Sequence, residues 1–171
     1  SQLAADGVAG MAMVVTHIAS ATAGLTWMCM EWTSRGKPSA LGIATGAIAG
    51  LAAITPASGT VGPMGALAIG AASGVCCYIA AGRIKRAFGY DDSLDAFGVH
   101  GVGGTIGAIL TGVFASNSVQ EGYSGLLEDN SGQLLNNFLG VLLTWVFAAV
   151  ATFIILKITD AICGVRVSEA D

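Results

Sequence analysis

Five long runs of apolar and small residues, separated by short polar loops, constrain this chain more than any other feature of its sequence. They cover residues 4–32, 38–54, 62–82, 93–115 and 134–158. A helix needs about 20 apolar residues to cross the hydrocarbon core of a bilayer, and all but the second run reach that length. Only 11% of the residues are charged, whereas soluble domains carry about 25%. We therefore predict an all-α integral membrane protein with five transmembrane helices.

The basic residues provide a check on this number of spans, because Lys and Arg concentrate in cytoplasmic loops. Five of the seven follow the first or third run, and the other two lie at the end of the fifth run or after it. They are Arg35, Lys37, Arg83, Lys85, Arg86, Lys157 and Arg166. The two other loops contain no base. We therefore predict that residues 1–165 form a transmembrane bundle that begins outside the cell, and that residues 166–171 begin a cytoplasmic tail.

Glycines recur at four-residue spacing in three of the runs, a pattern that lets helices approach one another closely. They are Gly42, Gly46, Gly50, Gly70, Gly74, Gly103 and Gly107. The pattern predicts a tightly packed bundle. The run 134–158 is instead rich in Leu, Val, Ile and aromatic residues, so we expect it to face lipid on the outside.

Several function classes are disfavoured by the composition. Seven basic residues form no patch that fits nucleic acid. The cysteines, Cys29, Cys76, Cys77 and Cys163, lie in or beside apolar runs without metal-ligand spacing, so we interpret them as packing residues and expect no metal or other cofactor. The sequence contains none of the common hydrolase, phosphate-loop or metalloprotease motifs. We therefore predict that the protein is not an enzyme.

One ionisable residue, His100, lies deep inside the fourth run. Burying an imidazole in hydrocarbon costs free energy unless it is paired, so an ionisable residue in a transmembrane segment is a candidate functional residue. Its helical neighbours include Gly103, Gly104 and Gly107, which leave room for a small solute or another backbone. We predict that His100 lines a pore or relays protons. The alternative is a structural histidine that bonds a neighbouring helix.

Other polar residues in or beside the runs have simpler interpretations. Asp91, Asp92 and Asp95 precede the core of the fourth run, where carboxylates cap free N–H groups and oppose the helix dipole. Asp95 lies deepest of the three and is the one most suited to a further role. We interpret His17 as a packing residue, with a second relay position as the alternative. Glu31 is expected at the membrane interface, with a part in conduction as the alternative.

The segment from Asp91 to Ala115, with its central sequence FGVHGVGG, closely resembles the tenth transmembrane helix of bacterial ammonium transporters of the Amt/Mep/Rh family. Further matching segments follow the family in order, at residues 24–32, 46–51, 55–59 and 164–167. The resemblance covers essentially the whole chain. It implies that these five helices correspond to helices seven to eleven, the C-terminal half of an eleven-helix transporter.

The resemblance also implies a function in nitrogen uptake. Such transporters are homotrimers of the plasma (inner) membrane, and each subunit has a narrow apolar pore. Ammonium is recruited at the outer mouth and deprotonated, and ammonia and the proton then pass two facing histidines. His100 matches the second of these histidines, and Ser1 looks like the serine of the outer recruitment site. An imidazole with a pKa near neutrality suits this role, since it can both accept and donate a proton.

The resemblance implies several partners. They are ammonium or ammonia, with methylammonium as an analogue, the first six helices of the transporter, two further copies in the trimer, the lipid bilayer and a PII-type signal protein. Two other functions remain open. The chain could belong to an ammonium sensor of the same fold coupled to a signalling module. It could also be a purely structural half-bundle in which His100 holds helices together.

Overall fold

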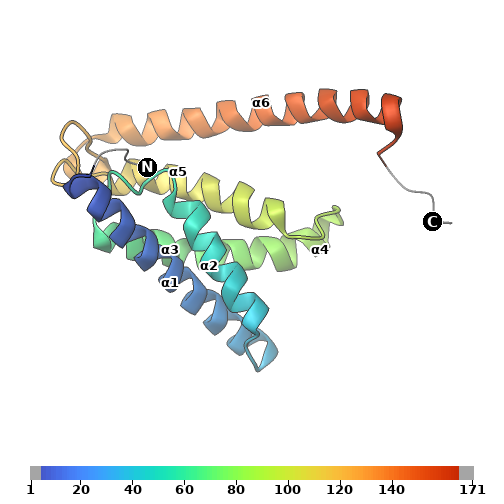
Figure 1. The fold of residues 1–171 in the computed structure, drawn as a ribbon, viewed down its shortest axis with the longest axis horizontal. Helices are drawn as coiled ribbons and strands as arrows, with labels where there is room; N and C mark the ends of the chain where they lie inside the picture. The colour runs from blue at the N-terminus through green and yellow to red at the C-terminus, as the bar shows by residue number, and fades with distance from the viewer. Residues whose placement is uncertain (1–4, 166–171) are drawn as a thin grey trace.

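The computed structural model describes residues 5–165, and this part of the chain is helical throughout apart from its loops (Figure 1). The six α-helices are α1 (Gly7–Arg35), α2 (Ala40–Ile54), α3 (Pro63–Ile79), α4 (Lys85–Phe88), α5 (Val102–Phe114) and α6 (Ser131–Cys163). A π-helical segment, η1 (Ala80–Ile84), joins α3 to α4, and a second, η2 (Phe97–Gly101), leads directly into α5. A 3₁₀ turn, η3 (Leu126–Glu128), lies in the loop before α6. The described chain is thus all-α, as predicted.

Four continuous helical rods are long and apolar enough to cross a membrane. They are α1, the rod Pro63–Phe88, the rod Phe97–Phe114 and α6. Helix α2 has 15 residues and therefore rises only about 22 Å, less than the hydrocarbon core of a typical bilayer. Four spans are thus supported by helix length, while the crossing by α2 stays a prediction.

Local sequence explains where the main helices begin and end. The side chains of Asp6, Ser39 and Asn130 each accept a hydrogen bond from the N–H three residues further along, at the starts of α1, α2 and α6. Pro63 begins α3, where its missing N–H costs nothing. Gly36 ends α1 with φ of 77°, a left-handed conformation that favours glycine.

Close backbone contacts at glycines build the core. A Cβ placed on Gly50 or Gly70 would lie 2.4 or 2.6 Å from the carbonyl oxygen of Ala19 in α1. A Cβ on Gly107 of α5 would lie 1.9 Å from the carbonyl oxygen of Ala53 in α2. Helices α1, α2, α3 and α5 therefore pack backbone against backbone, and the prediction of a tight bundle is confirmed.

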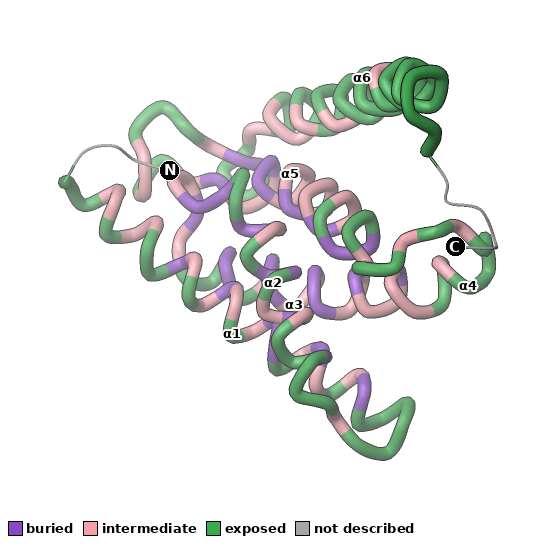
Figure 2. The backbone as a smooth tube through the Cα atoms, turned by 45° about the vertical axis from the view of Figure 1, so that its right-hand side comes forward, coloured by how far each residue is buried: buried purple, intermediate pink, exposed green. Residues whose placement is uncertain are grey.

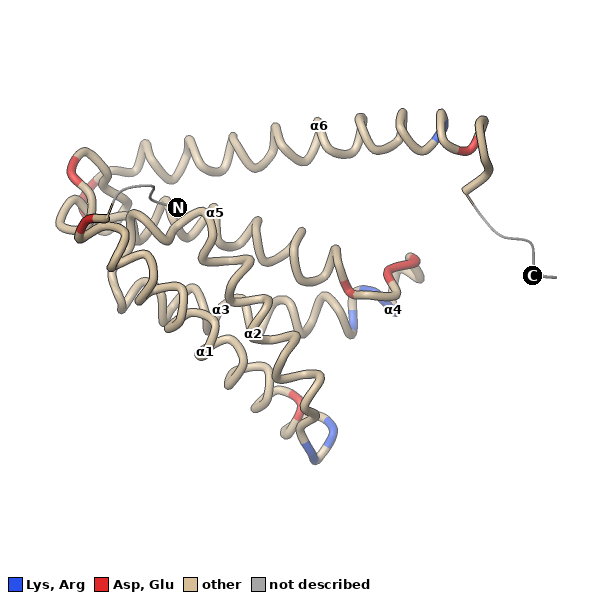
Figure 3. The backbone as a smooth tube through the Cα atoms, viewed as in Figure 1, with Lys and Arg blue, Asp and Glu red and all other residues tan. Residues whose placement is uncertain are grey.

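Helix α6 differs from the other four long elements. It lies on the outside of the bundle, alongside α5 at its start and further from it towards its C-terminal end (Figure 1). None of its residues is buried (Figure 2). Charged residues of the described chain lie near helix ends and in loops, which leaves the middle of each long helix uncharged (Figure 3). This arrangement agrees with the expected outer position of the run 134–158.

Candidate functional site

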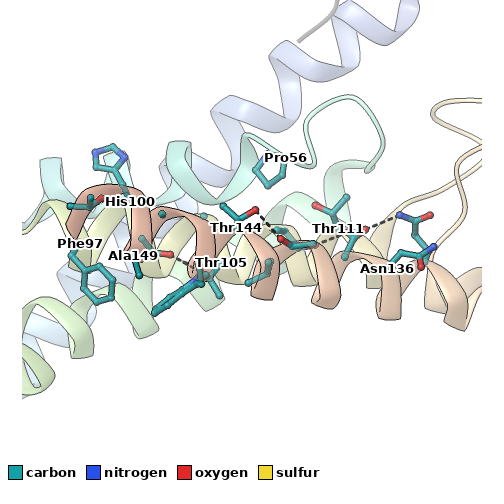
Figure 4. A pocket seen from close by; sticks show the side chains of 18 of the residues that line it. Pro56, Phe97, His100, Thr105, Thr111, Asn136, Thr144 and Ala149 are labelled. Carbon is teal, nitrogen blue, oxygen red and sulfur yellow. Dashed lines mark hydrogen bonds between the residues drawn. The ribbon is translucent and has the colours of Figure 1, made fainter. Parts of the chain in front are cut away.

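A cavity of about 1120 Å³ lies between α5 and α6 and contains the residues of interest (Figure 4). Its walls are mostly small or aromatic side chains of these two helices, and Pro56, Thr60 and Tyr123 contribute from loops. Polar side chains also contribute, among them Thr105, Thr111 and Asn136, which come from α5 and α6. We refer to this space as the α5–α6 cavity.

His100 lies in the π-helical segment η2 and lines the α5–α6 cavity. Its side chain is exposed, and no other residue in the described range 5–165 hydrogen-bonds the imidazole. Short π-helical segments within α-helices are frequent at functional sites. Figure 4 shows that His100 and Phe97 point in different directions from the same turn. Gly104, one turn after His100, also lines the cavity and has open space around it.

Asp92 fixes the beginning of the helical rod Phe97–Phe114, which carries His100. Its carboxylate accepts hydrogen bonds from the N–H groups of Ala96, Phe97 and Gly98 at 2.8, 3.0 and 3.3 Å. Asp95 adopts a φ of 54°, a left-handed conformation that costs free energy for a residue other than glycine. The rod consequently begins at Phe97 rather than at residue 93, where the apolar run begins.

The other carboxylates of this segment have different surroundings. Lys85, at the start of α4, donates to the Asp95 carboxylate at 2.7 Å and also to the carbonyl oxygen of Asp92. These contacts tie the end of the α3–α4 rod to the start of the rod that carries His100. Asp91 is exposed, and no capping contact involves it in the described chain.

Helices α2 and α3 support η2 and α5 from the side away from the cavity. The thiol of the buried Cys77 in α3 donates to the carbonyl oxygen of Val99 at 3.7 Å. Gly98 packs against the backbone of Ala81, so that a Cβ at position 98 would lie 3.1 Å from it. Cys77 thus has a packing role in the structure. The residue before His100 is consequently held by contacts that leave the imidazole free.

Helix α6 supports α5 from the other side through contacts that the sequence analysis did not identify. Asn137 donates to the carbonyl oxygen of Ala108 at 2.7 Å, and Trp145 donates through Nε1 to Thr105 Oγ1 at 2.8 Å. The rings of Phe97 and Trp145 pack edge to face with centroids 5.7 Å apart. The sequence feature that could have indicated these contacts is the presence of Asn137 and Trp145, two side chains with hydrogen-bond donors, in the otherwise apolar run 134–158.

The remaining candidate residues lie away from His100. His17 in α1 is exposed, with Nδ1 2.9 Å from the carbonyl oxygen of Met13 in its own helix, and it does not line the α5–α6 cavity. Glu31 lies near the end of α1, 3.5 Å from Arg35, and is buried to 4% exposure, while its expected position at the membrane interface stays a prediction. Its carboxylate accepts from the Ser39 N–H at 2.8 Å and is accommodated because residue 42 is glycine. Ser1 lies outside the described residues.

The loop between α5 and α6 is ordered by a carboxylate. Glu128 accepts hydrogen bonds from Ser116 Oγ at 2.6 Å and from the Asn117 N–H at 2.9 Å. These two bonds, with Ser116 the stronger influence, hold the pKa of the Glu128 carboxyl below its ordinary value. Tyr123 of this loop reaches the α5–α6 cavity, so the carboxylate helps to shape one end of the cavity. Within residues 5–165, no group of three or more His, Cys, Asp or Glu residues is placed to hold a metal ion.

Comparison with known proteins identifies the family. The family model described as "Ammonium Transporter Family" matches residues 1–171. The chain is 47% identical over 171 residues to an ammonium transporter of Aquifex aeolicus, covering all of this chain and 40% of that protein. It is 46% identical over 172 residues to ammonium transporter Amt1 of Archaeoglobus fulgidus, covering all of this chain and 43% of that protein.

Solved structures agree with the sequence comparison. The crystal structure of Saccharomyces cerevisiae Mep2 matches with a TM-score of 0.88 and 33% identity, over 96% of this chain and 38% of that one. A structure titled "Sensor Amt Protein" matches with a TM-score of 0.83 and 30% identity, over 94% and 39%. The chain spans about 40% of the length of the curated relatives it matches. With its several membrane-length helices, the chain is a multi-pass membrane protein and belongs to the Ammonium Transporter Family.

Proposed function

We propose that this chain forms part of a membrane transporter that moves ammonium or ammonia, and that His100 lines the conduction path. The observation that carries this proposal is the position of the imidazole, which borders the α5–α6 cavity without a hydrogen-bond partner among the described residues. The imidazole therefore joins no two helices within residues 5–165. An unpaired imidazole beside glycines is instead available to a small solute.

The chemistry of the cavity suits ammonium. The lining residues next to His100 are Phe97, Gly101 and Gly104, which offer no side-chain oxygen to replace the hydration shell of sodium or potassium. Ammonium can lose its proton, and the neutral molecule then enters an apolar path at lower cost. An imidazole accepts and donates a proton near neutral pH, so His100 is suited to relay the proton. This role requires no bond making within the substrate other than proton transfer, which agrees with a transporter rather than an enzyme.

The chain needs a further segment to enclose such a path. The cavity lies between α5 and α6 at the edge of the bundle, and α6 has no buried residue. Relatives of the chain are about two and a half times as long. We propose that the first six helices of the transporter cover the cavity, with Ser1 at the outer recruitment site. The assembly would be a homotrimer in the plasma membrane, with the basic loops in the cytoplasm and open to a PII-type signal protein.

A sensor is the second candidate, because the structure titled "Sensor Amt Protein" has nearly the same helical arrangement, with a TM-score of 0.83. In a sensor, ammonium would occupy the same cavity and alter an attached signalling module. Transport and sensing therefore differ in flux and not in binding.

The test is uptake of methylammonium, with current recorded, in liposomes that contain this chain together with the first six helices. His100→Ala and His100→Asp are compared with the parent, and His17→Ala is the matched control. Saturable uptake that is lost or becomes unselective only in the His100 variants supports the proposal. Equal uptake in all variants contradicts it. Binding of methylammonium without uptake in the parent supports the sensor.

A further inference from the structure

Two hydrogen bonds in series connect α6 to the turn that carries His100. Trp145 Nε1 donates to Thr105 Oγ1 at 2.8 Å, and the same hydroxyl donates to the carbonyl oxygen of Gly101 at 2.7 Å. Gly101 directly follows His100 in η2. Hydrogen bonds in a chain polarise and strengthen one another, especially where the surroundings are apolar. The indole of Trp145 therefore acts on the backbone beside His100 although it does not contact the imidazole.

The same indole also contacts Phe97, three residues before His100. The ring of Phe97 packs edge to face against Trp145, with centroids 5.7 Å apart and an interplanar angle of 78°. Tyr90 packs against Phe97 in the same way, at 5.7 Å and 87°. Phe97 also lies over Gly101, because a Cβ at that glycine would be 2.8 Å from the Phe97 ring. Trp145 thus supports both ends of the π-helical segment.

This support affects the orientation of His100 because the segment η2 is π-helical. A π-helical turn contains about one residue more than an α-helical turn, and each residue of an α-helix advances by about 100°. If η2 changed to an α-helix, His100 would therefore turn by a large angle relative to α5. From the α3 side the only polar contact to this segment in the described chain is the weak donor Cys77, at 3.7 Å from the Val99 oxygen. Asp92 holds the first N–H groups of the segment, and at its other end the polar support comes from α6 through Thr105.

We propose that Trp145 and Thr105 are positioning residues, which hold the π-helical turn and so set the direction in which the imidazole of His100 points. The effect on transport rests on the proposed function. The effect on the conformation of His100 does not, and can be measured separately.

Three substitutions in the full transporter test the proposal. Thr105→Val removes the hydroxyl and keeps the shape of the side chain, whereas Thr105→Ser keeps the hydroxyl. Trp145→Phe keeps an aromatic ring beside Phe97 and removes the N–H donor. Thr144→Val is the matched control, because Thr144 also lines the α5–α6 cavity but donates only to Gly140 of its own helix. If Thr105→Val does not fold, Trp145→Phe alone tests whether the hydrogen bonds through Thr105 position His100.

Two readouts are needed, at one fixed pH. The first is the ¹⁵N NMR signal of His100 in bilayers, assigned with His100→Gln, and His17 serves as an internal reference. The second is methylammonium uptake. We expect Thr105→Val and Trp145→Phe to shift the His100 signal, leave that of His17 in place and lower uptake on the order of tenfold, as misplacement of a functional group does. Thr105→Ser should resemble the parent in both readouts, and Thr144→Val should leave the His100 signal where it is in the parent.

An unchanged His100 signal in both Thr105→Val and Trp145→Phe would overturn the proposal. A shift of equal size in Thr144→Val would do the same, since it would assign the effect to cavity polarity. Failure of the proposed function has a different outcome, because the parent itself would then show no uptake. A shifted His100 signal would still support the positioning role in that case.

Discussion

At the scale of single residues, the two glycines Gly104 and Gly107 show how one residue type serves two purposes in one helix. A Cβ at Gly107 would lie 1.9 Å from the Ala53 carbonyl oxygen, whereas a Cβ at Gly104 would meet nothing within 4 Å. Gly107 therefore permits the contact between α5 and α2, and Gly104 leaves space in the α5–α6 cavity.

We predict opposite effects for alanine at these two positions. Gly107→Ala should destabilise the protein by about 1–3 kcal/mol, because an added methyl group in a packed core forces the backbone to shift. Gly104→Ala should leave the melting temperature unchanged and act only on uptake, since its methyl group enters the cavity. Thermal unfolding in detergent measures the first effect. Equal melting temperatures for the two variants would contradict the assignment.

Glu128 predicts a pH dependence for the loop between α5 and α6. Its hydrogen bonds with Ser116 and Asn117 hold the pKa of this carboxyl below its ordinary value. A group whose pKa is lowered by folding stabilises the folded state above its unfolded pKa, and this contribution is lost as the pH falls through the folded pKa. Residues 116–130 should therefore exchange amide hydrogens faster below about pH 4, after correction for intrinsic rates. In Glu128→Gln this additional acid dependence should be absent.

At the scale of the elements, polar contacts help to hold α6 against α5. Lipid is as apolar as leucine, so burial of apolar side chains gives little net attraction between helices in a membrane. Asn137 and Trp145 instead bond α5 directly. Close packing adds to this, since Gly112 lies against the backbone of Leu134.

Loss of the hydrogen bond from Asn137 to Ala108 should separate α6 from α5 near these two residues. A hydrogen bond of this kind contributes only about 0.6 kcal/mol in a membrane protein, so the change in melting temperature should be small. The distance between spin labels on α5 and α6 is the suitable measurement, and we expect a broader distribution in Asn137→Leu. Asn136→Leu is the control, because Asn136 lines the cavity without bonding α5. Identical distributions in both variants and the parent would refute the assignment.

The sequence predicts the helices better than the contacts between them. Apolar length and glycine spacing give the helical runs, and Gly50, Gly70 and Gly107 are at close contacts as expected. The start of the rod carrying His100 was not predictable, because it depends on the cap by Asp92 and the positive φ of Asp95. These are local conformations that apolar periodicity does not report.

The surroundings of the candidate site were predictable only in part. His100 is visible in the sequence because an ionisable residue is rare in an apolar run. Thr105 and Trp145 are 40 residues apart, and nothing in either run specifies that they meet. Burial of Glu31 was missed for a similar reason, since it requires the space beside Gly42 and the N–H of Ser39.

At the scale of the whole molecule, the chain presents an open surface where a transporter needs an enclosed path. We expect the first six helices to protect this surface. A cysteine introduced at Gly104 should react rapidly with a polar thiol reagent when the chain is alone in detergent, and more slowly by at least about tenfold when those helices are present. A cysteine replacing Phe147, which is exposed on α6, is the comparison. Equal protection at both positions would indicate general shielding rather than specific closure.

The absence of buried residues in α6 also bears on how freely its sequence can vary. A helix that is retained by a few polar contacts and otherwise requires only apolar character accepts many substitutions. In a saturation mutagenesis experiment, exchanges among Leu, Ile, Val and Phe should be nearly neutral at those positions of residues 146–158 that do not line the α5–α6 cavity, while Asn137 and Trp145 tolerate few replacements. Mutational tolerance along α6 would then follow individual hydrogen bonds, whereas in α1, α2 and α3 it would follow the space available for a side chain.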